Sequence, residues 1–312
     1  MKLSWLISRL SPTAAAVAVL TCAVQAAHAQ CISVPDQGKL LLTGGVIEVD
    51  GAGGGGLVPW AMITGYGTRD SVGANAHETF VNTSDFRLNS YGAAVGLLDR
   101  VELSFNRHDL TITADGTGLP LNGVRIGQDI FGLKVKIIGD IVYDQGSAIP
   151  EISLGLQYKS NNGIRGGVFG SGIKPTDLGA KANDGTDLYV AFSKLLLAQS
   201  LFVNGTIRAT KANEFGLLGF GGDRNDGYRP EFEGSVGYLV NRKVAIGGEV
   251  RTKPHNLTLD NEKAAWDLFV AWAPIKTVSV VAAYLNLGKI LDGPAGYSST
   301  QQGPYVSLQV GF

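Results

Sequence analysis

Apolar and polar residues alternate along most of this chain, and this period of two restricts its fold more than any other feature. The alternation is most regular over 101–106 and 151–159, where every second side chain is apolar. Successive side chains of a β-strand point to opposite faces, so these segments are typical of strands with one apolar face. Since no segment carries a sustained helical stripe, the sequence predicts an all-β fold.

The alternating segments predict a transmembrane up-and-down antiparallel β-barrel. Most of them approach the roughly 9–11 residues that a tilted membrane strand requires, and an even number of strands closes such a barrel. We expect about twelve strands, near 57–68, 90–97, 101–106, 130–138, 151–159, 187–193, 203–209, 231–238, 244–251, 265–273, 278–287 and 304–312.

The expected connections alternate in length, as they do in outer-membrane barrels with short periplasmic turns and long external loops. Long polar connections are expected at 69–89, 109–128, 160–186, 211–227, 252–263 and 289–303. Short ones are expected at 98–100, 195–200, 240–243 and 274–277, and 139–150 is intermediate. A soluble β-sandwich would also alternate, but this asymmetry favours the membrane barrel.

The N-terminal residues have the features of a secretory signal peptide. Lys2 and Arg9 precede an apolar run at 14–24, which is followed by the small-residue cleavage pattern Ala27-His28-Ala29. We predict cleavage after Ala29, so that residues 1–29 are removed. The alternative, a membrane anchor, is disfavoured because the apolar run is too short to span a bilayer.

The mature chain is nearly balanced in charge and has a single cysteine, Cys31. Loss of the signal peptide lowers the basic count from 26 to 24, against 27 acidic residues. Such a balance gives no reason to expect a nucleic-acid partner. One cysteine cannot form an intrachain disulfide, and the residues before Cys31 do not fit a lipidation signal.

Residues 30–56 precede the first expected strand and are predicted to be a short Gly-rich plug in the lumen or a periplasmic tail. The barrel is then expected to span 57–312. The glycine run at 51–56 formally matches G-x-G-x-x-G, but it does not open a helix in a β-α-β unit, as a dinucleotide site requires. We expect a hinge there and no cofactor.

The last expected strand ends on Phe312, which resembles the assembly signal of outer-membrane barrels. A closed barrel also removes the unpaired edge that a terminal strand would otherwise expose. These features predict the outer membrane of a Gram-negative bacterium. The expected partners are the barrel-assembly machinery, outer-membrane lipid and lipopolysaccharide.

The polar face of the strands should line the lumen, because charges in a membrane barrel must face water or one another. This face contains Glu102, Lys134, Lys136, Glu151, Lys159, Asp187, Arg208, Glu231, Glu233, Glu249, Arg251 and Asp267. These charges could line an aqueous path, or they could pair across the lumen and close it. The segment 278–287 is apolar on both faces, which keeps a hydrophobic solute among the candidates.

No catalytic constellation is recognised, and we predict that the protein is not an enzyme. The three histidines of the mature chain are His77 and His255, expected in loops, and His108, expected at a strand end. None lies in the motif of barrel lipid hydrolases, and all three are expected to be solvated. Oxygen-rich clusters at 183–187 and 223–227 could bind calcium, but both lack a complete calcium-loop spacing and Asp-Gly pairs are common in turns.

A resemblance to a known family supports the barrel. Residues 39–45, 57–60, 65–67 and 97–105 resemble a proteobacterial family known only as a domain of unknown function. The chain is more distantly similar to barrels associated with phenol degradation. The family brings no established activity, so the resemblance supports the fold. From the inward charges and the size of a barrel of about twelve strands, we predict a passive channel or uptake porin for a small solute, hydrophobic or aromatic compounds included. The alternative is a structural or surface-interaction barrel with a closed lumen.

Overall fold

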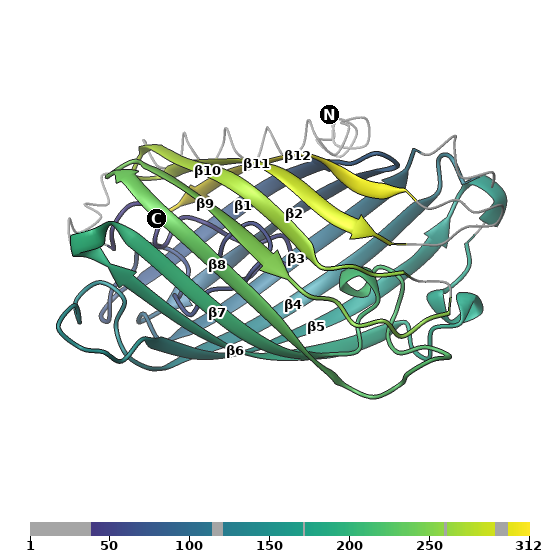
Figure 1. Ribbon diagram of the computed structural model, residues 1–312, viewed down its shortest axis with the longest axis horizontal. Coiled ribbons are helices and arrows are strands. Elements are labelled where there is room, and N and C mark those ends of the chain that lie inside the picture. Colours follow the sequence, from purple (N-terminus) through teal and green to yellow (C-terminus); the bar gives the residue numbers. More distant parts are fainter. Residues whose placement is uncertain (1–38, 114–120, 171, 259–260, 291–298) are drawn as a thin grey trace, which may run out of the picture. The chain divides into compact units, whose positions relative to one another are not determined.

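The computed structural model describes residues 39–113, 121–170, 172–258, 261–290 and 299–312. These residues belong to one compact unit, Lys39–Phe312. The predicted signal peptide and residues 30–38 lie outside the described part of the chain. Twelve strands form a closed antiparallel barrel, in which each strand pairs with its neighbours in sequence and β1 pairs with β12 (Figure 1). The predicted all-β barrel is therefore confirmed.

The strands follow one another along the chain, and the described parts of the connections contain four short 3-10 turns. The strands are β1 (Val72–Asn82), β2 (Phe86–Leu97), β3 (Val101–Ile112), β4 (Arg125–Ile138), β5 (Glu151–Arg165), β6 (Asp184–Leu196), β7 (Leu201–Thr210), β8 (Arg229–Asn241), β9 (Val244–Arg251), β10 (Ala265–Ile275), β11 (Val278–Lys289) and β12 (Thr300–Gly311). The 3-10 turns are η1 (Gly167–Phe169), η2 (Pro175–Leu178), η3 (Leu197–Gln199) and η4 (Glu214–Gly216). None of the helical turns in the described ranges has the length and hydropathy of a membrane-spanning helix.

The alternation places large apolar side chains on the outside of the barrel and polar ones inside. In β10, Trp266, Leu268 and Val270 are exposed, whereas Asp267 and Phe269 are buried in the lumen. Aromatic rings also pair between neighbouring strands on the outer face, as Phe105 and Phe131 do with their ring centroids 5.2 Å apart. The barrel is thus apolar outside and polar inside.

One predicted strand is wrong. The residues expected to form the first strand, 57–68, are not a strand, and the first strand is instead β1, which we had expected within the long loop 69–89. The predicted boundary at residue 57 therefore moves to Val72. The outward face of β1 includes Ala74 and Ala76, so the apolar side of its alternation is weak. As a result β1 and β2 are joined by the short connection 83–85, while the other expected long connections remain long.

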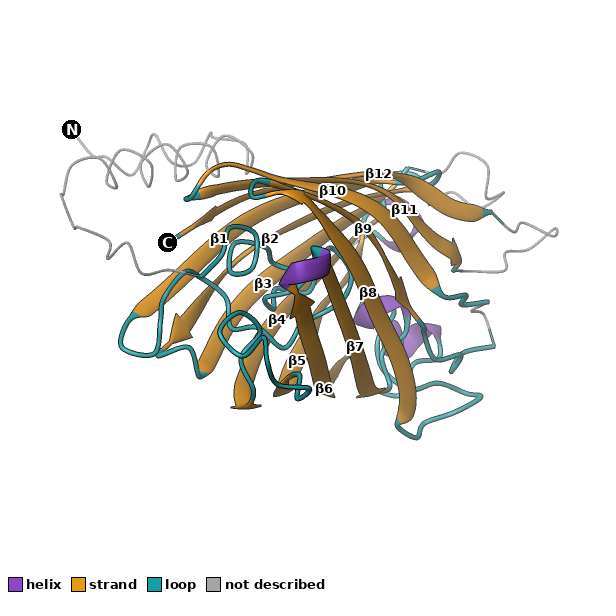
Figure 2. Cartoon of the chain, turned by 60° about the vertical axis from the view of Figure 1, so that its left-hand side comes forward, coloured by secondary structure: helices purple, strands orange, loops and turns teal. Residues whose placement is uncertain are grey.

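The segment 39–71, which we call the plug, has its central part inside the barrel. Every residue from Gly44 to Gly67 is buried, and the segment is held by its own turns and bridges, such as Ile47 with Gly53. In Figures 1 and 2 it runs as a loop within the wall of strands. Of the two predicted alternatives for the N-terminal region, the described part therefore adopts the plug.

Gly65 joins the plug to the wall at a point where only glycine fits. Its φ of +78° lies in the left-handed region, and a Cβ there would lie 2.5 Å from the main-chain nitrogen of Ala74 in β1. The missing side chain therefore allows plug and strand backbones to touch.

We expect Gly65→Ala to lower the free energy of unfolding by about 1–3 kcal/mol, because it adds both backbone strain and overlap with β1. Gly146→Ala is the control, because Gly146 has nothing within 4 Å of an added Cβ. Urea unfolding in detergent, followed by circular dichroism, measures both variants. Equal stability of the two would contradict the close approach seen at Gly65.

Candidate functional site: the plugged lumen

The structure places the predicted lumen residues on inward positions of the strands. All except Glu231 are buried, and Glu231 is partly exposed near the long-loop end, where it accepts a hydrogen bond from Thr252. Most of the buried charges do not face an open channel. They contact the plug or one another, and the plug is the part of the site that strand periodicity did not reveal.

Lys134 of β4 and Glu102 of β3 hold the plug from one side of the wall. Their side chains form a buried ion pair of 3.1 Å. The Lys134 ammonium also donates to the carbonyl oxygens of Gly53, at 2.8 Å, and Trp60, at 3.1 Å. Glu102 accepts hydrogen bonds from the main-chain N–H groups of Gly53 and Thr64. This pair thus satisfies backbone groups of the plug, which has no sheet of its own.

Asp50 of the plug lies at the centre of the largest charge network. One of its oxygens is 2.9 Å from Lys159 and 2.9 Å from Arg251. Lys159 also contacts Asp187 at 3.2 Å, and Arg251 contacts Glu233 at 3.3 Å. One plug carboxylate therefore bridges two cations, one on β5 and one on β9.

Arg208 closes this network along the wall. Its guanidinium pairs with Glu233 on β8, lies 3.4 Å from Asp187 on β6, and donates to the side-chain oxygen of Gln157. Gln157 in turn donates to Glu48 of the plug at 2.7 Å. The charges of strands β5 to β9 and of the plug thus form one continuous set of contacts.

A second charge cluster lies at the short-turn end of the barrel. Asp99, in the turn between β2 and β3, pairs with Lys136 and with Lys39 at the start of the plug, the latter at 2.8 Å. Glu151 lies 3.8 Å from Lys136. Burial alone would raise the pKa of Asp99, but the two ammonium groups outweigh burial and hold its pKa below the usual value. This cluster fastens the plug where it enters the barrel.

Uncharged wall residues also bind the plug backbone, and the search for charges did not single them out. Gln309 accepts from the N–H of Ile47 at 2.7 Å, and Ser193 accepts from the N–H of Ala61 at 2.8 Å. Asn106 donates to the carbonyl of Val49 at 2.8 Å. Their inward position on alternating strands was readable in the sequence, whereas their partner in the lumen was not.

We had expected all three histidines to be solvated, and for two of them this prediction is wrong. His77 lies on β1 and His108 on β3, and both are buried. His77 lies 3.0 Å from the side-chain oxygen of Asn106, and His108 lies 2.7 Å from the carbonyl of Val49. The error for His77 follows from the misplaced first strand. His255 lies in the connection between β9 and β10 and contacts Arg224.

The loop carboxylates that could have bound calcium have protein partners. Asp184 accepts from Ser160 at 2.7 Å, and Asp223 accepts from the N–H of Thr258 at 2.8 Å. Asp226 lies 3.3 Å from Lys211. These contacts help to hold the long connections in place.

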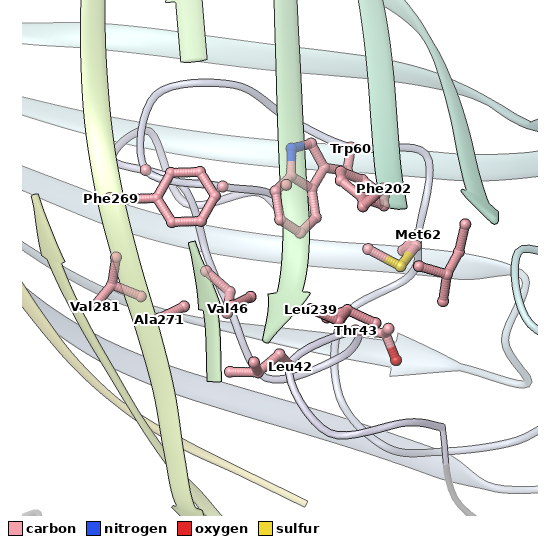
Figure 3. A pocket seen from close by; sticks show the side chains of 15 residues that line it. Leu42, Thr43, Val46, Trp60, Met62, Phe202, Leu239, Phe269, Ala271 and Val281 are labelled. Atoms are coloured by element: carbon pink, nitrogen blue, oxygen red, sulfur yellow. The ribbon is translucent and has the colours of Figure 1, made fainter. Parts of the chain in front are cut away.

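Two apolar cavities flank the charged network. The turn-end cavity measures about 40 Å³ and lies among Trp60, Met62, Phe202 and Phe269, with Ala271 also on its wall (Figure 3). The rings of Trp60 and Phe202 pack at 4.3 Å between centroids, and the Trp60 indole N–H donates to Ser235. This cavity lies between the plug and strands β6 to β11.

The loop-end cavity measures about 70 Å³ and lies on the other side of the plug. Its walls include Leu57 of the plug, Phe86 of β2, Ile126 of β4, Phe215 of the β7–β8 connection and Leu285 of β11. The inward apolar residues of β11 thus contribute to both cavities, in keeping with the apolar character expected for 278–287. From the short-turn end to the long-loop end, the lumen therefore contains the turn-end cavity, then the charged network, and then the loop-end cavity.

We expect Lys134→Met to lower the free energy of unfolding by about 3–5 kcal/mol, because it leaves Glu102 and two plug carbonyls without their cation. Lys243→Met, in the exposed β8–β9 turn, is the matched control and should have little effect. Chemical unfolding of both variants in detergent provides the comparison. A Lys134→Met protein as stable as the control would show that the lumen ion pair does not stabilise the plugged barrel.

Solved structures that match this chain in a structural comparison share little sequence with it. NanC porin has a TM-score of 0.48 at 10% identity, covering 77% of this chain and 99% of that one. KdgM porin has a TM-score of 0.44 at 9% identity, with 77% and 99% covered. The COG4313 outer membrane channel from Pseudomonas putida F1 has a TM-score of 0.44 at 12% identity, with 77% and 93% covered.

A search of the curated proteins finds no match. The model of one protein family, described as a protein of unknown function (DUF3034), matches residues 43–309, which is most of the sequence. The chain belongs to the DUF3034 family.

Proposed function

We propose that this protein is an outer-membrane channel that is closed by its plug and opens for passive uptake of a small solute when the plug moves. The observation that carries this proposal is the burial of every residue from Gly44 to Gly67 within a wall whose inward face is charged. A wall built only to be sealed could be apolar inside, as a protein core is. A charged wall remains compatible with water once the plug leaves it.

The outer surface supports a place in a bilayer. On β10, Leu268 is 62% exposed and Trp272 is 49% exposed, and the other strands present similar apolar side chains outward. A soluble protein rarely exposes a continuous apolar surface of this extent. A bilayer covers such a belt, and the closed barrel leaves no strand edge unpaired in lipid.

The two cavities favour a small apolar or aromatic solute. Both are lined mainly by aliphatic and aromatic side chains, and they lie at opposite ends of the charged layer. An apolar cavity of about 150 Å³ holds benzene, and the loop-end cavity of about 70 Å³ would have to widen to reach that size. Movement of Phe215 or of the plug at Leu57 would widen it. A solute would then pass from one apolar space to the other as the plug is displaced.

A structural barrel is the second candidate, and the charge network around Asp50 favours it. Asp50, Lys159, Asp187, Arg208 and Glu233 are all buried and paired. Removal of the plug would take the Asp50 carboxylate from Lys159 and Arg251 and leave each of these cations with a single carboxylate on the wall. Such a network resists opening. We assign no catalytic role to either form, because His77 and His108 bond to wall and plug groups.

We infer from the C-terminal strand that barrel assembly uses Phe312 as its recognition residue. The Phe312 side chain is 56% exposed, while its main chain bonds to β1. Its ring is thus free for the assembly machinery, and outer-membrane lipid and lipopolysaccharide would surround the belt.

Removal of the plug should open the barrel. We expect a variant in which a short Gly-Ser linker replaces residues 44–67 to give sustained current steps in planar bilayers, while the intact protein remains mostly closed. In the control variant, the same linker replaces residues 143–148 in the exposed β4–β5 connection, which tests whether insertion of the linker by itself affects conductance. If neither the intact protein nor the plug-replacement variant conducts, the structural barrel is favoured. If these two proteins conduct equally, the plug is not the gate.

The turn-end cavity should bind small apolar compounds, and Trp60 provides the signal. We expect xenon, a heavy-atom quencher small enough for an apolar cavity of about 40 Å³, to quench the Trp60 fluorescence of the intact protein in a saturable manner. Ala271→Leu, which fills the cavity, should abolish this quenching at a cost of about 1–3 kcal/mol in stability. Val270→Leu changes the adjacent outward residue and should leave it unchanged. Equal quenching of both variants would argue against an apolar site in this cavity.

A further inference from the structure

Two neighbouring carboxylates in the lumen lack a cationic partner. Asp267 of β10 and Glu249 of β9 are directly opposite one another in the strand pairing, and both are buried. Within the described residues, neither takes part in an ion pair of 4 Å or less, although the other carboxylates of the buried layer do. Arg251, the next inward residue of β9, is already engaged by Asp50, Glu48 and Glu233. Like charges directly opposite one another destabilise a sheet.

Glu249 is held in place by the plug and the wall. One of its oxygens accepts the N–H of Leu57 at 2.6 Å, and the other accepts the hydroxyl of Ser235 at 2.7 Å. Asp267 differs, because neither of its side-chain oxygens has a hydrogen-bond partner among the described residues. A buried carboxylate without a donor or a counter-charge is strongly unfavourable.

A third oxygen points to a ligand at this place. The hydroxyl of Tyr305 on β12 is buried and also has no hydrogen-bond partner among the described residues. A carbon atom added to Gly56 of the plug would lie 3.1 Å from an oxygen of Asp267 and 3.6 Å from an oxygen of Glu249. It would lie 3.5 Å from the ring carbon that bears the Tyr305 hydroxyl. The absence of a side chain at Gly56 thus leaves room beside these three oxygen-bearing side chains.

We propose that Asp267, Glu249 and Tyr305 bind one hard metal cation against Gly56 of the plug. Carboxylate and hydroxyl oxygens are the ligands of Ca²⁺, Mg²⁺ and Na⁺, and a cation supplies the positive charge that this pair lacks. The ion would lie between the two apolar cavities, beside the plug residues Gly56 and Leu57. It would join strands β9, β10 and β12 beside the plug, and its loss would leave the Asp267 and Glu249 carboxylates facing one another without a counter-charge.

The test uses the full-length mature protein in detergent, stripped with a chelator and exchanged into tetramethylammonium chloride, whose cation is too large for the site. Addition of CaCl₂, MgCl₂ or NaCl at constant ionic strength should raise the midpoint of thermal unfolding in a saturable manner for at least one metal. Elemental analysis of the protein loaded with that metal should find one ion per chain. The three salts distinguish which hard cation the site prefers.

Two variants locate the ion. Asp267→Asn removes one of the two facing charges, so the metal-free variant should fold at least as well as the metal-free parent, while its affinity for the ion falls at least tenfold. Gly56→Ala keeps both carboxylates but fills the point between them, and it should also lose the ion. Asp226→Asn, in the exposed β7–β8 connection, should keep the full response.

Three outcomes would overturn the proposal. The first is a thermal midpoint that no metal salt changes. The second is a metal response that Asp267→Asn retains, which would place the ion elsewhere, for instance in the loops. The third is a midpoint that depends on pH alone, which would mean that a proton balances the pair instead of a metal.

Discussion

Burial of charge inside a closed barrel is the constraint on which the rest of this structure depends. Charged side chains cannot lie in a water-free lumen without partners, because the cost of removing them from water exceeds most other terms in stability. The plug supplies those partners through Asp50, through Glu48 and through its backbone carbonyls. In turn, side chains of the wall form hydrogen bonds with the backbone groups of the plug, which forms no sheet of its own. Wall and plug are thus mutually required.

The period of two was sufficient to predict most of the wall, because it follows directly from the geometry of a strand between lipid and lumen. It failed at the start of the barrel. Residues 57–68 are apolar enough to resemble a strand, yet they are buried on all sides within the lumen. In β1 the outward face has Ala76 where other strands have large apolar residues. Periodicity shows which side chains share a face of a strand. It is weakest where the outward face has few large apolar side chains.

The inward face of the strands was predictable, but the contacts that it makes were not. Sequence identifies Lys134 and Arg251 as inward cations, since their neighbours are apolar. It does not show that both reach the plug, because a contact between residues 53 and 134 depends on how the plug turns in three dimensions. The same reason explains His108 and Gln309, whose partners Val49 and Ile47 lie far from them along the chain. The two apolar cavities likewise arise only from the packing of plug against wall.

The seam between β1 and β12 has a consequence for the order of folding. The main-chain oxygen of Phe312 accepts the N–H groups of both Ala74 in β1 and Tyr66 in the plug. The last strand therefore completes the cylinder and grips the plug with the same atom. A plug that arrived after closure would have to enter through a finished wall, whereas one already seated offers β12 a template. Docking of the plug and closure of the barrel are thus linked, because both use the main-chain oxygen of Phe312 as an acceptor.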